Sequence, residues 1–376
     1  MQTFTLTWPT RLHFGCGTLA LVPDLLRSLG AKRPLVLAGM GAMKRAGQLS
    51  RLGELLREWP VGFHTGIGPN PTVADLGAAV AAVRREQPDC LIALGGGSVV
   101  DVAKSARVLA QLDDAGLERW LGGELLPEGR YPPCVGVPTT AGAASEVTPW
   151  ATIWRPEQGL KTSLEGGCLV PEFAVVDPEL TLSLPAEQSV SCGLDALSHA
   201  IESYWAPRSQ PCSRALSLEA VRLVLQNLPR VAREPGNLQA REEISWACTL
   251  AGLSFSQTKT TAAHALSYPL TLRFGVRHGI ACALFLPAVL EFNAERNSGP
   301  YQRLFASLGA GRAGEAAEAL RGFYEGLRIS PRLSSHGVTR ASFESIAAAA
   351  LASPRSLNNP RPLSLGDALA ILEATA

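Results

Sequence analysis

Three of the six histidines and one aspartate have the types and spacing of a metal site. Asp195 and His199 stand four residues apart in GLDALSHAIESY, and on a helix two such residues project from one face about one turn apart. His264 and His278 follow in TAAHALSYPL and FGVRHGIACA. Three imidazoles and one carboxylate suit Fe²⁺ or Zn²⁺, and a vacant coordination position would admit a substrate oxygen. The set predicts a catalytic metal site, although each histidine alone would be an ordinary core or surface residue.

A glycine-rich turn is the second motif. The segment CLIALGGGSVVDVAK runs from an apolar strand through Gly95, Gly96 and Gly97 into a helix that begins near Ser98. Glycines let a phosphate approach the backbone, and the N–H groups that open a helix favour negative charge. The turn lacks the GxGxxG spacing of the dinucleotide fingerprint, so by itself it indicates either a phosphate site or only a tight turn.

The predicted secondary structure changes once along the chain, from alternating strands and helices to helices alone. The apolar runs PLVLAG, CLIALGGG, CVGVPTT and FAVVDP are typical of strands, and TVADLGAAVAAVRREQ is typical of a helix between two of them. Beyond about Pro185 the apolar residues follow helical spacing, as in EEISWACTLAGLSF. We expect an α/β dinucleotide-binding domain over residues 1–184 and an all-α domain, with the metal and substrate sites, over residues 185–376.

Six segments resemble, in order and spacing, the iron-containing (group III) alcohol dehydrogenases. They are GGGSVVDVAK, PTTAGAASEVT, VVDPELTLSLP, GLDALSHAIESY, HALSYPL and RHGIACALFLP. The resemblance implies a dehydroquinate-synthase-like fold with the active site in a cleft between the domains. It also implies a metal held by Asp195, His199, His264 and His278, interconversion of an alcohol and an aldehyde with NAD or NADP, and a homodimer.

The expected cofactor site departs from the family after its first long strand. Many members that use NAD carry an aspartate there, where this chain has GMGAMKR. No acid stands at Gly39 or Met40, and Lys44 and Arg45 follow, so the sequence favours NADP, with NAD as the alternative.

Other expected cofactor contacts follow the family motifs. Thr139 and Thr140 match its cofactor-facing threonines, whereas Ala143 and Ala144 replace its usual Thr-Gly. The expected cofactor set is Gly39, Lys44, Gly95, Gly96, Gly97, Ser98, Asp101, Thr139, Thr140 and Lys161.

Basic residues near the ligands predict an anionic substrate. Lys259, Arg273 and Arg277 lie close in sequence to two ligands, and a guanidinium fork suits phosphonate, sulfonate or carboxylate oxygens. The surrounding segments resemble the phosphonoacetaldehyde reductase branch, which forms 2-hydroxyethylphosphonate. The alternatives are a general primary alcohol dehydrogenase with these cations on its surface, and a maleylacetate- or lactaldehyde-type reductase.

Tyr268 is the expected proton donor. It stands where many family members have a second histidine that relays protons. A tyrosine hydroxyl can donate a proton, but its ordinary pKa of about 10 makes it a poorer shuttle at neutral pH. The alternative is an aromatic ring packed at the cleft, with proton release through the ribose hydroxyl or solvent.

Composition narrows the class of protein. The 34 basic and 33 acidic residues nearly balance, so the chain has no net electrostatic field that would attract nucleic acid or a membrane surface. The eight cysteines form no CxxC pair, and the start has no basic segment followed by an apolar one, so we expect a cytoplasmic enzyme with reduced thiols. A dehydroquinate-synthase-like lyase and a non-catalytic binding protein stay open, and NAD(P)H turnover and metal content distinguish them.

Overall fold

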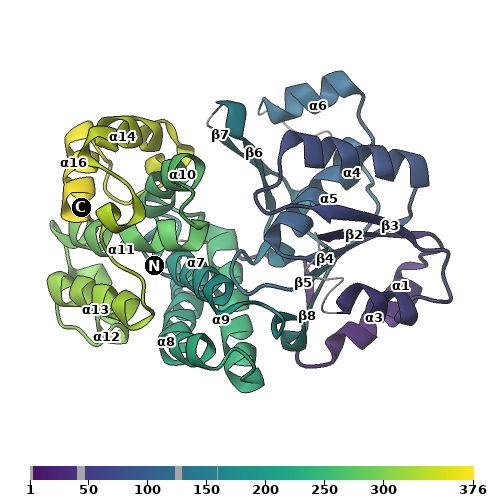
Figure 1. Cartoon of the computed structure of the whole chain (residues 1–376), viewed down its shortest axis with the longest axis horizontal. Helices are drawn as coiled ribbons and strands as arrows, with labels where there is room; N and C mark the ends of the chain where they lie inside the picture. Colours follow the sequence, from purple (N-terminus) through teal and green to yellow (C-terminus); the bar gives the residue numbers. More distant parts are fainter. Residues whose placement is uncertain (1–2, 40–46, 123–128, 159) are drawn as a thin grey trace. The chain divides into compact units, whose positions relative to one another are not determined.

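The chain divides into two compact units. The structure is a computed structural model that describes residues 3–39, 47–122, 129–158 and 160–376. One unit is Thr7–Ser183, and the other is Leu184–Ala376 together with the N-terminal residues up to Leu6 (Figure 1). The first is α/β and the second is helical, so the predicted succession of fold classes is confirmed.

A six-stranded parallel sheet forms the centre of the α/β unit. Its strand order is β1-β8-β5-β4-β2-β3. Every residue of the two central strands β4 and β5 is buried, as expected for a parallel sheet covered on both faces. The predicted apolar runs correspond to four of the strands. The bounds are β1 (Arg11–Phe14), β2 (Pro34–Gly39), β3 (Gly62–Ile67), β4 (Cys90–Gly95), β5 (Cys134–Pro138) and β8 (Phe173–Val176).

Helices cover both faces of this sheet. Alternate residues of β2 and β4 point to opposite faces and enter two separate apolar cores. The helices α1 (Val22–Leu29) and α3 (Gln48–Leu55) pack in one core, and α4 (Val73–Glu86) and α5 (Gly97–Leu109) pack in the other. The unit also includes α6 (Asp114–Leu121) and an antiparallel hairpin of β6 (Trp150–Arg155) and β7 (Leu160–Glu165).

The strand order reverses direction between β2 and β4. From β2 the chain moves outward to the edge strand β3, and from β4 it moves the other way through β5 to β8. Ala38 pairs with Leu94, and Gly95 pairs with Pro138, so the carboxyl ends of β2, β4 and β5 meet at one edge. Sheets of this kind bind ligands outside the carboxyl ends of the strands at such a reversal.

The helical unit has α7, α8 and α9 packed against one another, with α11 packed on both α7 and α10. At the crossing of α11 and α7, a Cβ on Gly279 would overlap the carbonyl oxygen of Ser191 and lie 2.9 Å from Asp195 Cβ. Only glycine allows this approach, and it brings the start of α11 against the middle of α7. The bounds are α7 (Ala186–Trp205), α8 (Pro211–Arg233), α9 (Leu238–Thr258), α10 (Ala262–Phe274), α11 (His278–Ala294), α12 (Gln302–Ser307), α13 (Ala313–Gly326), α14 (Phe343–Ala352), α15 (Pro354–Leu357) and α16 (Leu365–Ala374).

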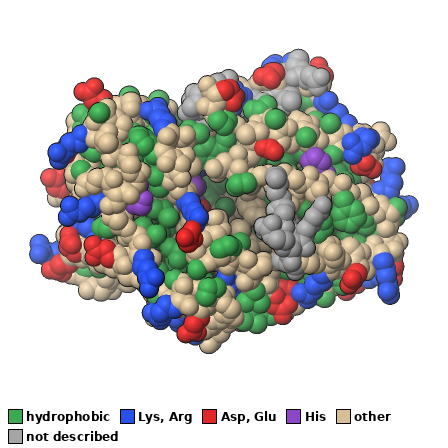
Figure 2. Space-filling view, viewed as in Figure 1, with side chains coloured by type: hydrophobic (Ala, Val, Ile, Leu, Met, Phe, Trp, Pro, Cys, Tyr) green, Lys and Arg blue, Asp and Glu red, His purple; other side chains and the backbone are tan. Residues whose placement is uncertain are grey.

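Charge is mixed over the surface. Acidic and basic side chains are interspersed on the face shown in Figure 2, in line with the formal net charge of +1. Across the described ranges, every helix falls short of the length and apolar character that crossing a membrane would require.

Candidate metal centre and nucleotide site

Four potential ligands from three helices converge in the helical unit. Asp195 comes from α7, His264 from α10, and His278 and Cys282 from α11. One ligand atom from each residue lies within 4.8 Å of the others. Among the described residues, these four side chains form a group that could hold a metal ion. Three of the four predicted ligands therefore meet, together with a cysteine that the prediction omitted.

Two atoms of this group make no hydrogen bond within the described structure. Asp195 Oδ1 and His264 Nε2 are buried, lie 3.6 Å apart, and make no hydrogen bond there. A buried polar atom without a partner costs about 1–3 kcal/mol, so such atoms call for an explanation. A divalent cation between them would accept a lone pair from each, and the oxygen and nitrogen donors fit Fe²⁺ or Zn²⁺.

The electrostatics favour a positive charge at this place. Burial opposes ionisation of Asp195, but the imidazoles of His199, His264 and His278 outweigh it and hold the pKa of the carboxyl below its ordinary value. Burial also opposes a charge on His264, but Cys282, Glu202 and Asp195 raise its pKa well above the ordinary value.

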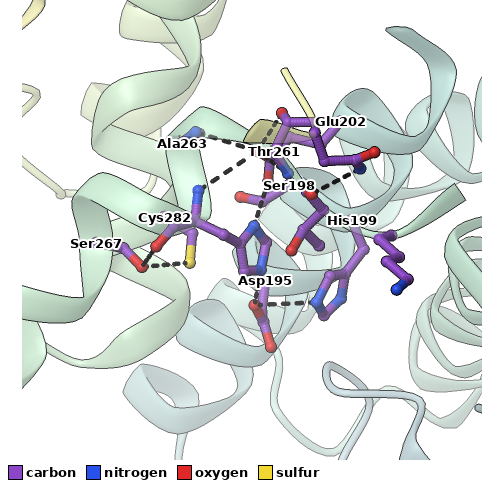
Figure 3. A network of polar contacts seen from close by, with 12 residues as sticks. Asp195, Ser198, His199, Glu202, Thr261, Ala263, Ser267 and Cys282 are labelled. Carbon is purple, nitrogen blue, oxygen red and sulfur yellow. Dashed lines mark hydrogen bonds and ion pairs between the residues drawn. The ribbon is translucent and has the colours of Figure 1, made fainter. Parts of the chain in front are cut away.

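His199 lies beside the group, on the same helix as Asp195. Its Nε2 is 3.8 Å from Asp195 Oδ1 (Figure 3). Its ring stacks on Phe255 and on His264, with ring centroids 4.2 and 4.8 Å apart. His199 is thus adjacent to Asp195, and its role as a ligand stays a prediction.

Glu202 holds His264 in place from the opposite side of the ring. This fully buried carboxylate accepts hydrogen bonds from the backbone N–H of Thr261 at 2.9 Å and of Ala263 at 3.1 Å, and from the Thr261 hydroxyl at 2.6 Å (Figure 3). Its other oxygen contacts His264 Nδ1. Burial opposes its charge, but His264 and Thr261 lower its pKa.

This contact decides which nitrogen of His264 is available. An ionised carboxylate only accepts hydrogen bonds, so Nδ1 carries a proton, and Nε2, which faces Asp195, has a lone pair for a metal ion when the imidazole is neutral. Sequence analysis missed Glu202. The available signal was its position three residues after His199, on the same face of the helix.

The glycine turn of the α/β unit lies at the end of β4. A Cβ on Gly95 would lie 2.5 Å from Val99 Cγ2, and one on Gly97 would lie 2.5 Å from the Cβ of Ala143, so close packing explains both glycines. Gly96 precedes α5, and no described side chain caps the helix start. The N–H groups there can meet an anion.

Other predicted cofactor residues surround this edge of the sheet. The Thr139 N–H donates to the Gly95 carbonyl at 2.9 Å, Thr140 lies 3.3 Å from a Cβ built on Gly96, and the Ser98 hydroxyl accepts from the Asn70 N–H at 3.2 Å. Gly39 ends β2, whereas Met40, Lys44 and Arg45 lie outside the described residues.

Asp101 and Lys161 make contacts within the protein. Asp101 accepts hydrogen bonds from the Ser145 hydroxyl and, at 2.9 Å, from the Thr152 N–H. The Lys161 ammonium lies 5.2 Å from the centre of the Trp154 ring, on the hairpin. Their roles in cofactor binding stay predictions.

Two family models together match most of the chain. Residues 9–178 match the family described as iron-containing alcohol dehydrogenase, and residues 189–376 match the Fe-containing alcohol dehydrogenase family, C-terminal. This chain belongs to the iron-containing alcohol dehydrogenase family. It is an NAD(P)-dependent oxidoreductase of the alcohol dehydrogenase type, as the motifs predict.

Named relatives cover almost the whole chain. The 1,3-propanediol dehydrogenase of Klebsiella pneumoniae is 31% identical over 94% of both chains. The choline dehydrogenase of Bacillus subtilis is 32% identical over 96% of this chain and 93% of its own.

Solved structures confirm the dehydroquinate-synthase-like fold class. The sulfoacetaldehyde reductase from Bifidobacterium kashiwanohense in complex with NAD⁺ has a TM-score of 0.93 and 29% identity, covering 100% of this chain and 99% of that one.

Tyr268 lies beside the group of candidate metal ligands. Its ring stacks on that of His278, with centroids 6.0 Å apart. The position is compatible with the predicted proton donor and equally with an aromatic ring packed on a ligand.

The three predicted substrate cations are spread over the helical unit. Lys259 ends α9 with a φ of 65° and is half-buried. Arg273 is exposed and donates to the Ser345 hydroxyl at 3.1 Å. Arg277 forms an ion pair with Glu187 at 2.8 Å, and its side chain is 46% exposed. Their substrate role stays a prediction.

Proposed function

We propose that this enzyme is a metal-dependent NAD(P)H-linked reductase of a small anionic aldehyde, and that phosphonoacetaldehyde is the best candidate. The observation that carries the metal dependence is that the buried atoms Asp195 Oδ1 and His264 Nε2 face each other and make no hydrogen bond. A divalent ion between this carboxylate oxygen and this imidazole nitrogen would give both atoms a partner.

The residues of the helical unit have distinct tasks in this proposal. When bound, a divalent ion would supply Lewis-acid polarisation of the substrate carbonyl, and a nicotinamide cofactor would supply the hydride. Asp195, His264 and His278 would hold the ion, with His199 beside them. Glu202 keeps the Nε2 lone pair of His264 directed at the site.

The tasks of the α/β unit and of Tyr268 complete the proposal. The N–H groups at the start of α5 and the close packing at Gly95 and Gly97 suit the cofactor's pyrophosphate. Gly39 brings no carboxylate to the end of β2, which supports NADP. Tyr268, stacked on His278, would donate a proton to the developing alcohol.

Two observations bear on the anionic substrate. The relative from Bifidobacterium kashiwanohense reduces sulfoacetaldehyde, which carries an anionic sulfonate head. In this chain Arg277 is already paired with Glu187, so a phosphonate head would have to compete with that carboxylate. The relative supports the proposal, and the pairing limits how strongly Arg277 can contribute.

A substrate panel tests the proposal directly. NADPH and NADH oxidation should be measured with phosphonoacetaldehyde, sulfoacetaldehyde and propanal, with metal analysis of the same sample. We expect the highest kcat/KM with phosphonoacetaldehyde and a divalent metal at about one ion per chain. Preference for propanal would make the enzyme a general primary alcohol dehydrogenase, and full activity without metal would overturn the metal dependence.

We also propose a cytoplasmic homodimer, on the strength of the family resemblance and of a sequence without a CxxC pair. Light scattering of the purified chain tests the assembly, and a monomeric mass would contradict it.

A further inference from the structure

Lys259 has a backbone conformation that glycine normally supplies. It ends α9 with a φ of 65° and a ψ of 172°, a region that residues other than glycine almost never adopt. Gln87 and Ala144 also have positive φ, but their ψ values of 55° and 35° place them in the ordinary left-handed helical region. The backbone of Lys259 is therefore strained, and a glycine at this position would not be.

Hydrogen bonds from side chains hold this strained segment. Asn358, at the end of α15, donates from Nδ2 to the carbonyl oxygens of Thr258 at 2.9 Å and of Thr260 at 3.0 Å. These two carbonyls lie on either side of Lys259. The Thr258 hydroxyl donates to the carbonyl oxygen of Lys259 itself at 3.1 Å. All three consecutive carbonyls are thus bound, and a strained backbone persists only when its surroundings hold it in this way.

Asn358 is fixed in turn through the residue that follows it. Asn359 is buried and exchanges two hydrogen bonds with Asn293 of α11, at 2.7 and 3.3 Å. Helix α11 begins at His278. The segment that holds Lys259 is therefore attached to a helix that carries a candidate metal ligand.

The neighbours of Lys259 in the chain contact residues of the candidate metal site. The Lys259 N–H donates to the carbonyl of Phe255 at 2.8 Å, and the Phe255 ring stacks on that of His199. Two residues after Lys259, Thr261 donates to the buried carboxylate of Glu202. Lys259 itself is half-buried. It is thus attached on both sides to side chains that surround the candidate ligands.

Lys259 suits an anionic head group better than the other two predicted cations do. Arg273 is exposed and donates to the Ser345 hydroxyl, and Arg277 is already paired with Glu187. Lys259 is also the single lysine among residues 184–376, in a region otherwise supplied with arginine. A compact ammonium on a flexible stem binds phosphonate or sulfonate oxygens as a point charge.

We propose that Lys259 is the specificity residue that binds the anionic head of the aldehyde, and that Asn358 is the positioning residue that holds it. This inference rests on the proposed function and deepens it, because it names the cation that selects the substrate. Glycine would adopt the conformation without strain but would bring no charge. The cost of placing a lysine there is offset when its ammonium group binds the substrate.

Steady-state kinetics of the full-length, metal-loaded enzyme test Lys259. Lys259→Met keeps an unbranched side chain and the strained backbone but removes the charge. We expect kcat/KM for phosphonoacetaldehyde and sulfoacetaldehyde to fall roughly 10- to 100-fold, mainly through KM, and that for propanal to stay within about twofold. The matched control is Arg303→Met, which removes an exposed cation of α12 and should leave the rates with all three aldehydes unchanged.

The kinetic outcomes separate this inference from the proposed function. Equal losses for charged and neutral aldehydes in Lys259→Met, or no loss for either, would overturn the role of Lys259 and leave the proposed function standing. A wild type that prefers propanal to both anionic aldehydes would overturn the anionic substrate and this inference together.

Thermal unfolding and kinetics together test Asn358. Lys259→Gly should have a Tm at least as high as that of Lys259→Met, because glycine removes the strain. Asn358→Ala should lower the Tm, and it should raise KM for phosphonoacetaldehyde but not for propanal. In the Lys259→Gly background the same substitution should lower the Tm by less, since less strain has to be held.

Three results would contradict the positioning role. A lower Tm in Lys259→Gly than in Lys259→Met would remove the strain on which it depends. An equal loss of Tm from Asn358→Ala in both backgrounds would show that Asn358 stabilises the fold independently of Lys259, and an unchanged KM for phosphonoacetaldehyde would separate it from the substrate. If Asn358→Ala alone does not fold, recovery of folding in the double variant supports the role, and its absence overturns it.

Discussion

Each unit of this enzyme contains a buried cluster of charged side chains. The hydrogen bonds of the cluster in the α/β unit are complete, whereas those of the cluster in the helical unit are not. In the α/β unit, Lys104 donates to the carbonyls of Ser145 at 2.8 Å, Thr148 at 3.2 Å and Trp150, and it lies 3.6 Å from Asp101. All three ammonium protons are used.

In the helical unit, by contrast, Asp195 Oδ1 and His264 Nε2 face each other at 3.6 Å and neither makes a hydrogen bond. The comparison teaches that burial of charge alone does not identify a site. A complete set of hydrogen bonds fits a cluster that joins segments of the fold, whereas a buried carboxylate and imidazole without hydrogen bonds, on neighbouring helices, leave room for a ligand between them.

The strongest test of this comparison is a matched pair of substitutions. Asp195→Asn should lower metal occupancy and activity together, because it removes the charge of a ligand. The loss of several kcal/mol of transition-state stabilisation corresponds to roughly 10³-fold or more in kcat/KM. Asp101→Asn should keep full metal occupancy in the folded protein. Undiminished metal in Asp195→Asn, measured by elemental analysis, would remove Asp195 from the site.

The satisfied cluster should instead affect folding. Lys104→Met leaves Asp101 and three buried carbonyls without their cation, and we expect a loss of about 3–5 kcal/mol in the free energy of unfolding. Urea denaturation measures it. The control Lys32→Met, at an exposed position, should stay within about 0.5 kcal/mol of wild type. Equal effects in both variants would mean that the buried cluster is not a fold element.

Glu202 links the two kinds of cluster, since it is fully satisfied yet supports an unsatisfied neighbour. Glu202→Gln cannot accept from both Thr261 and His264 at once, so we expect metal affinity to fall roughly 10- to 100-fold while the protein stays folded. Chelator competition measures the affinity, and circular dichroism checks the fold. Glu187→Gln, at an exposed position on the same helix, should leave the affinity unchanged. A wild-type affinity in Glu202→Gln would contradict the positioning role.

A smaller effect is expected at the end of β2. Gly39→Asp introduces a carboxylate at the strand edge where β4 and β5 also end, and it should repel the 2′-phosphate of NADPH. We expect the ratio of kcat/KM for NADPH to that for NADH to fall about tenfold, which corresponds to about 1.4 kcal/mol. A wild type that uses NADH and ignores NADPH would refute the underlying cofactor prediction.

The smallest effect concerns Arg277. Its ion pair with Glu187 is exposed on both sides, and exposed pairs contribute at most about 1 kcal/mol. Arg277→Ala should therefore lower the preference for phosphonoacetaldehyde over propanal by roughly fivefold or less. A selective loss of two orders of magnitude would show that the guanidinium leaves Glu187 and binds the substrate head group away from bulk water.

The sequence predicted the features that depend on neighbouring residues. The strand, turn and helix around Gly95 follow from the apolar runs and the glycines. Asp195 and His199 are four residues apart, so they lie on the same face of a helix. The family resemblance correctly indicated that His264 and His278 come close to Asp195.

Features that depend on how distant segments pack were not predictable in this way. The contact of Glu202 with Thr261 requires α10 to begin beside α7, across 59 residues of sequence. The pairing of Arg277 with Glu187 spans 90 residues, and Cys282 enters the metal group only because α11 crosses α7 closely. Periodicity fixes the direction of a side chain on its own helix but not the distance between helices.

Because the ligands lie on both α7 and α11, the geometry of a bound ion depends on the distance between these two helices. A single methyl group at Gly279 would collide with Ser191 and Asp195. Metal coordination tolerates deviations of only about 0.2 Å in ligand distance, which is far less than the shift that such a methyl group would force. The spectrum of a bound ion should therefore register displacements of α11 against α7 that are too small to change the fold, and Gly279→Ala supplies a calibration point.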